Sequence, residues 1–121
     1  MFEQEITVSE TETASAWFNL LAAFAGGMKS ADAAIAQLIW PSGFDQASAK
    51  IEFADDDTGT NGGALYDTDG TTILSNITKP AAGLRTALDP ATFCHLKYAR
   101  IVLPGAASAD FVFTFAMRKI S

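Results

Sequence analysis

The neighbouring residues Cys94 and His95 are the first candidates for chemistry, because a thiol and an imidazole together can act as nucleophile and base. Adjacent residues in a β-strand point to opposite faces, so the two could not form a dyad there. The chain also lacks the Gly-x-Ser-x-Gly pattern of serine hydrolases. We therefore expect a buried Cys94 and a surface His95 in a protein that is not an enzyme and uses no cofactor.

The run Asp55-Asp56-Asp57 is the second candidate, since carboxylates in a glycine-rich loop are typical ligands of Ca²⁺. The spacing does not fit an EF-hand. With Asp57 at the first loop position, Gly59 stands at the third, and Thr68 stands where a bidentate glutamate belongs. We expect a solvated acidic hairpin loop here and no metal site. A calcium site is the alternative, and a calcium titration of the melting temperature distinguishes the two.

Aromatic residues beside polar ones suggest a third kind of site. An exposed Trp40, with Tyr66 and Asp67, could form a platform on which a sugar ring stacks. Trp40 directly precedes Pro41 at the end of an apolar run, however, and we expect its ring in the core. Finding that ring in solvent would favour carbohydrate binding.

Apolar residues near the N-terminus are better candidates for a protein contact. The segment from Trp17 to Phe24 interrupts the β pattern and holds more apolar residues than a short helix needs. Aromatic residues are enriched in interface cores. The residues that we expect in a protein interface are Phe2, Ile6, Trp17, Phe18 and Phe24.

Composition and charge limit the partners. The 121 residues are 49% hydrophobic and 18% charged, which is typical of one globular domain, 1–121. The net charge of −6, without a basic stripe, argues against nucleic acid and against an anionic membrane as partners. The acidic N-terminus does not resemble a secretory signal. A single cysteine excludes an internal disulfide.

Hydrophobic periodicity indicates an all-β fold. About eight short stretches alternate in polarity and are separated by turn residues, which is typical of an antiparallel β-sandwich. One exception is 14–25, where apolar residues recur at helical spacing between Thr13, a potential N-cap, and Gly26-Gly27. We expect one short helical segment there and a candidate contact arm at 1–12.

From Ile35 to the C-terminus the order of features resembles a family of small virion proteins of tailed bacteriophages. An apolar strand ends in an aromatic residue and a proline, a strand of the form Ala-x-Ala-x-Ile-x-Phe follows, and an Asp-rich loop comes next. The family usually has Ser-x-Asp-Gly at that loop, and this chain has a longer one. The segments that carry the resemblance are Ile39-Trp40-Pro41, Ala47 to Phe53, Leu65 to Gly70, Leu88 to Phe93 and Tyr98 to Leu103.

The resemblance implies a jelly-roll-like sandwich that decorates, or cements, the outside of a phage capsid. The implied partner is the major capsid protein, and the implied assembly is a homotrimer made in the host cytoplasm and carried on the virion. Removal of residues 1–25 is then expected to abolish capsid binding. The alternative is a tail or fibre module that binds carbohydrate on the host surface.

Overall fold

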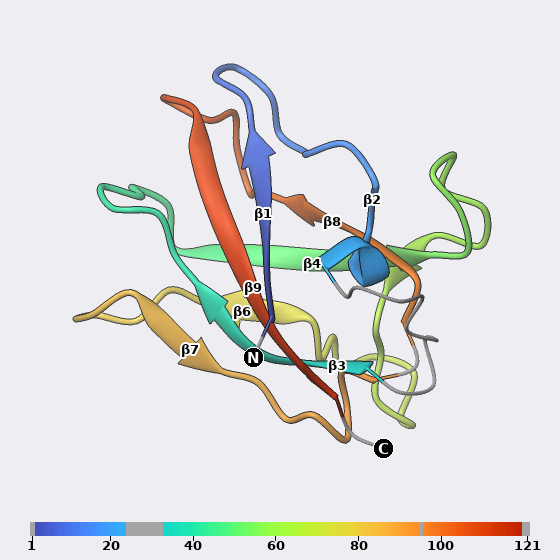
Figure 1. Cartoon of the computed structure of the whole chain (residues 1–121). Helices are drawn as coiled ribbons and strands as arrows, with labels where there is room; N and C mark the ends of the chain where they lie inside the picture. Colours follow the sequence, from blue (N-terminus) through green and yellow to red (C-terminus); the bar gives the residue numbers. More distant parts are fainter. Residues whose placement is uncertain (1, 24–32, 95, 120–121) are drawn as a thin grey trace.

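The computed structural model describes residues 2–23, 33–94 and 96–119. It is an antiparallel sandwich of two sheets (Figure 1). The first sheet has the order β1-β9-β3-β7, and every neighbouring pair is antiparallel. In Figure 1 the long β9 lies between β1 and β3. The strands of this sheet are β1 (Phe2–Val8), β9 (Phe111–Lys119), β3 (Ala33–Ile39) and β7 (Arg85–Ala87).

The second sheet has the order β2-β8-β4-β5, and β6 also pairs with β4. Two short strands thus share one side of β4, β6 near its start and β5 near its end. The strands are β2 (Phe18–Asn19), β8 (Tyr98–Val102), β4 (Ser48–Ala54), β5 (Gly63–Ala64) and β6 (Asn76–Thr78).

The strand order is that of a jelly roll. Strands β5 and β6 share one position in the second sheet, beside β4. The connections that join β4, β5 and β6 stay within that sheet, and every other connection runs from one sheet to the other. The first strand lies beside the last in one sheet, and the second lies beside the last but one in the other. Two interlocked Greek keys produce this arrangement. The predicted antiparallel, jelly-roll-like β-sandwich is therefore confirmed.

Aromatic rings fill the space between the sheets. Phe113 and Phe115 on β9 have no exposed surface, because alternation along the strand points them inward. The Phe44 ring packs edge-on against Phe113 with centroids 5.3 Å apart. Trp40 is 2% exposed, and its indole Nε1 donates a hydrogen bond of 2.8 Å to the Thr86 hydroxyl. The indole is thus buried with its polar atom satisfied, as predicted from the Trp40-Pro41 boundary.

The helical segment predicted at 14–25 is shorter than its apolar spacing suggested. Residues 18–19 form β2, and only Leu20–Ala23 are helical, as the 3-10 helix η1; residues 24–25 lie outside the described ranges. The Leu20 amide donates to the Lys97 carbonyl at 2.9 Å, so the chain is held against the segment that directly precedes β8. Pairing with a distant segment has overridden the local helical pattern.

The stretch 1–12, expected as a candidate arm, lies along the first sheet where it is described. All seven residues of β1 pair with β9, from Phe2 opposite Met117 to Val8 opposite Phe111. Beyond the strand, the Glu10 amide donates to the Asp110 carboxylate at 2.8 Å. Strand β1 therefore forms one edge of the sandwich.

Candidate interaction surface

Cys94 is the described member of the Cys94-His95 pair that was the first candidate for chemistry. Cys94 is half-buried, and its thiol donates to the Ala91 carbonyl at a sulfur–oxygen distance of 3.3 Å. A backbone bridge joins Cys94 to Ala34 of β3. His95 lies outside the described residues. Cys94 is therefore less buried than expected, and its one described side-chain partner is a backbone carbonyl.

Two of the three aspartates in the loop after β4, Asp55 and Asp56, form hydrogen bonds within that loop. Asp56 Oδ1 accepts hydrogen bonds from the Thr58 amide at 3.0 Å, the Thr58 hydroxyl at 2.8 Å and the Thr60 amide at 3.1 Å. The side chains of Thr60 and Thr58, with their amides, hold the pKa of Asp56 far below its ordinary value. Asp55 accepts a bond of 2.7 Å from the Asn61 amide group. Within the described ranges no three His, Cys, Asp or Glu side chains are grouped to hold a metal ion.

Of the five residues expected in a protein interface, the three whose side chains are described lie in different layers. Ile6 is 5% exposed and belongs to the core. Phe18 is half-buried and turns inward, with its ring centroid 5.7 Å from that of Phe115. Trp17, one residue earlier, lies against Arg100 of β8. Phe2 begins β1, but its side chain and the whole of Phe24 lie outside the part of the chain that is described.

Trp17 takes part in a layered contact on the outer side of the second sheet. The Arg100 guanidinium lies over the indole, 4.5 Å from its centroid, which is the geometry of a cation–π interaction. Glycines of the Asp-rich loop lie against the same indole, so closely that a Cβ on Gly59 would be 2.9 Å from Nε1. A loop and an arginine thereby cover part of the indole, and the side chain is half-buried.

Glu52 links this contact to the centre of the sheet. It lies opposite Arg100 in the β4–β8 register, and its Oε1 accepts two hydrogen bonds from Arg100, of 2.7 Å from Nη2 and 2.8 Å from Nε. Its Oε2 is 3.3 Å from the Lys50 ammonium. Partial burial favours the neutral carboxyl, but the hydrogen bonds and charge of Arg100, and then of Lys50, lower the pKa of Glu52 below its ordinary value.

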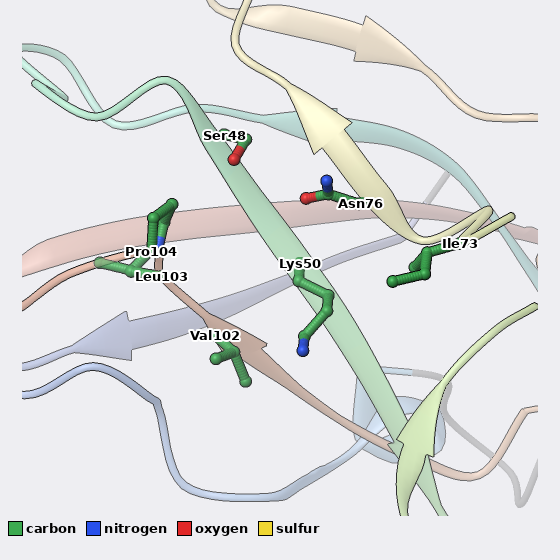
Figure 2. Close-up of a pocket in the computed structure, with 7 residues that line it drawn as sticks. All are labelled: Ser48, Lys50, Ile73, Asn76, Val102, Leu103 and Pro104. Carbon is green, nitrogen blue, oxygen red and sulfur yellow. The ribbon is translucent and has the colours of Figure 1, made fainter. Parts of the chain in front are cut away.

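An open groove of about 340 Å³ continues the surface on the other side of Lys50. Lys50 lies opposite Val102 of β8 and opposite Asn76 of β6, so three strands contribute one row of side chains. Figure 2 shows Lys50 in the middle of the groove, with Ile73 on one side and Val102 and Pro104 on the other. The described residues that line it are Ser48, Lys50, Ile73, Asn76, Val102, Leu103 and Pro104.

The residues considered for sugar stacking do not come together around an exposed tryptophan. Trp40 is in the core, so it offers no face to a ligand. Tyr66 is 51% exposed and is joined by a backbone bridge to Ile73, which also lines the groove. Asp67 closes the adjoining turn through bonds between its backbone and Thr72 and Gly70. Tyr66 is the remaining aromatic residue of that prediction with an exposed ring.

Sequence reasoning missed the groove for an identifiable reason. Alternation in β4 places Lys50 and Glu52 on the face opposite Ile51, and this much is readable from the sequence. The neighbours of Lys50 are Asn76 and Val102, which follow it in the chain by 26 and 52 positions. Their placement beside Lys50 depends on the register of three strands. No local signal specifies that register.

Comparison with known proteins identifies no relative: no protein-family description, curated protein or solved structure matches the chain. Among the described residues, no helix has the length and apolar character required to cross a bilayer.

Proposed function

We propose that the chain is a structural virion protein that decorates and stabilises a bacteriophage capsid by bridging major capsid protein subunits. The observation that carries the proposal is the jelly-roll order, on which the segments that resemble the virion family fall as successive strands and turns. Ile39 ends β3, residues 48–53 lie in β4, and residues 98–102 form β8. A fold alone does not fix a function, so the resemblance supplies the specific role.

The outer face of the second sheet provides the contact in this proposal. Trp and Arg are the residues that most often dominate interface energies, and Trp17 and Arg100 are stacked there. The groove beside Lys50 adds apolar surface, which contributes about 25 cal/mol per Å² when it is buried. Assembly as a homotrimer on the capsid exterior would multiply such contacts through avidity. The acidic net charge of −6 favours solubility at high local concentration.

The test is to locate the chain on particles of the phage whose genome encodes it. Mass spectrometry of purified virions gives the copy number, and immunogold labelling shows whether heads or tails carry the chain. We expect many copies on heads, and a trimer when the purified chain is sedimented. Virions without the chain would contradict the proposal, and labelling confined to tails would favour the carbohydrate-binding alternative.

A matched pair of variants tests the contact surface. Heads that lack the protein are incubated with Trp17→Ala or with Tyr66→Ala, each of which removes one aromatic ring. We expect Trp17→Ala to lower occupancy about tenfold or more, as for an interface hot spot, and Tyr66→Ala to leave it unchanged. Thermal melts are needed as a control that both variants are folded at the assay temperature. Equal occupancy for both variants and the wild type would exclude Trp17 from the contact.

A further inference from the structure

The groove on the outer face of the second sheet has a charge opposite to that of the whole protein. Among the lining residues that the structure describes, Lys50 is the one ionisable side chain, in a chain whose net charge is −6. The Glu52 carboxylate is paired both with Arg100 and with Lys50, so the three side chains together carry one excess positive charge. An anionic group is therefore the complementary ligand for this part of the surface.

Lys50 can change its partner without leaving a carboxylate unpaired. Its distance of 3.3 Å to Glu52 Oε2 is longer than either bond from Arg100 to Oε1. If the ammonium moves toward a ligand, Glu52 keeps its two bonds of 2.7 and 2.8 Å to Arg100. The lysine stem is long and its side chain is 34% exposed, so this movement requires no change in the backbone.

The rest of the lining fits a peptide better than a small free anion. Val102 and Pro104 form an apolar wall on one side, and Ile73 lies on the other; Leu103 lies behind this wall and is only 4% exposed. Ser48 and Asn76 add a hydroxyl and a side-chain amide, both of which can bond to a peptide backbone. The groove is open to solvent and has a volume of about 340 Å³, and an extended chain that crossed it would present alternate side chains to its floor.

We propose that this groove binds an extended peptide segment of a partner protein, with one carboxylate paired to Lys50 and a neighbouring apolar side chain against Val102 and Pro104. The inference goes beyond capsid decoration, because it specifies the chemistry of the bound segment whichever protein carries it. It therefore has a test that needs no capsid.

The test is a selection from a library of displayed random peptides. The full chain is immobilised on a support, and the peptides that it retains are sequenced. We expect the enriched sequences to contain Asp or Glu beside an aliphatic residue. The most enriched peptide is then synthesised with its acid or with the matching amide, and calorimetry gives the two affinities. We expect the amide version to bind about tenfold more weakly or worse, since it loses a charge-assisted hydrogen bond.

Two lysine variants locate the binding. Lys50→Met removes the ammonium and keeps most of the stem. We expect it to lower the affinity for the acidic peptide by the same factor as the amide substitution in the peptide. Lys97→Met makes the same change in an exposed lysine that lines a different hollow, and its affinity should equal that of the wild type. Amide chemical shifts of Ser48, Asn76 and Val102 should move on titration with the peptide.

Several outcomes would overturn the inference. The first is that the selection enriches no peptide over bare support. The second is that the selected peptides bind Lys50→Met and the wild type with equal affinity. The third is that a second copy of the chain covers the groove. The last would appear as self-association that Lys50→Met weakens. Capsid occupancy is measured separately, so a chain that occupies heads but selects no acidic peptide would refute this inference and leave the decoration proposal standing.

Discussion

At the scale of single residues, Trp17 explains why glycine is present in the loop that follows β4. Gly59 has a φ of +84°, and a Cβ there would come within 2.9 Å of the indole nitrogen. Two constraints thus act on one residue, the left-handed backbone and the close approach of the ring. The sequence indicated a solvated acidic loop, and it did not indicate that a tryptophan 42 positions earlier would pack against it.

Alanine at position 59 should therefore cost more stability than alanine at another left-handed glycine. Gly70 is the matched control, because its φ is +75° and no atom lies within 4 Å of the position that a Cβ would take there. We expect Gly70→Ala to cost about 1–2 kcal/mol from backbone strain alone. Gly59→Ala should cost that amount and a further penalty from the displaced indole, measured as the free energy of unfolding in urea.

A double-mutant cycle assigns the extra penalty to the ring. In a Trp17→Ala background, Gly59→Ala has no indole to displace, and its cost should fall to that of Gly70→Ala. An unchanged cost in that background would show that the loop backbone, and not Trp17, demands glycine at this position.

At the scale of elements, the segment before β2 shows how a side chain can replace a strand partner. Ser15 is 8% exposed, and its amide donates to the Ile101 carbonyl at 2.9 Å. Its hydroxyl accepts the Ile101 amide, also at 2.9 Å, and donates to the Ala16 carbonyl at 3.0 Å. The helical spacing of residues 14–25 was a correct observation, but these bonds to β8 are long-range and could not be inferred from it.

Ser15→Ala should destabilise the fold, because it leaves the buried Ile101 amide without its acceptor. A buried unsatisfied donor costs about 1–3 kcal/mol. Ser9→Ala removes the same hydroxyl from an exposed position and should change the free energy of unfolding by less than about 0.5 kcal/mol. Hydrogen exchange at the Ile101 amide should accelerate in Ser15→Ala alone. Wild-type stability with unchanged exchange would mean that water satisfies the amide.

At the scale of the whole molecule, the fold was more predictable than the surface. Alternation placed Phe111, Phe113 and Phe115 on one face of a strand, and all three are buried. Such patterns are local, and together with the resemblance they sufficed for a jelly-roll-like sandwich. The groove and the Trp17–Arg100 contact depend on which strands pair and in what register. A period-2 pattern says which side chains share a face and leaves open which strand lies next to it.

Strand β1 is the element for which the observed strand pairing most changes the expected result of an experiment. If residues 1–25 are a contact segment, their deletion is expected to abolish capsid binding. Strand β1 lies within that range, and its Ile6 and Val8 are 5% and 0% exposed in the core. Each such side chain contributes about 1.5–3 kcal/mol when buried. A small domain has a total stability of only about 5–15 kcal/mol.

Deletion of residues 1–9 alone should therefore unfold the chain, since it removes both core residues and exposes the paired edge of β9. We expect loss of the β-sheet circular-dichroism signal and of a cooperative melt. The control is Glu3→Gln with Glu5→Gln, which alters two exposed side chains of the same strand and should melt cooperatively like the wild type. A deletion variant that still melts cooperatively would show that 1–9 is an arm, and its capsid occupancy would then measure the contact directly.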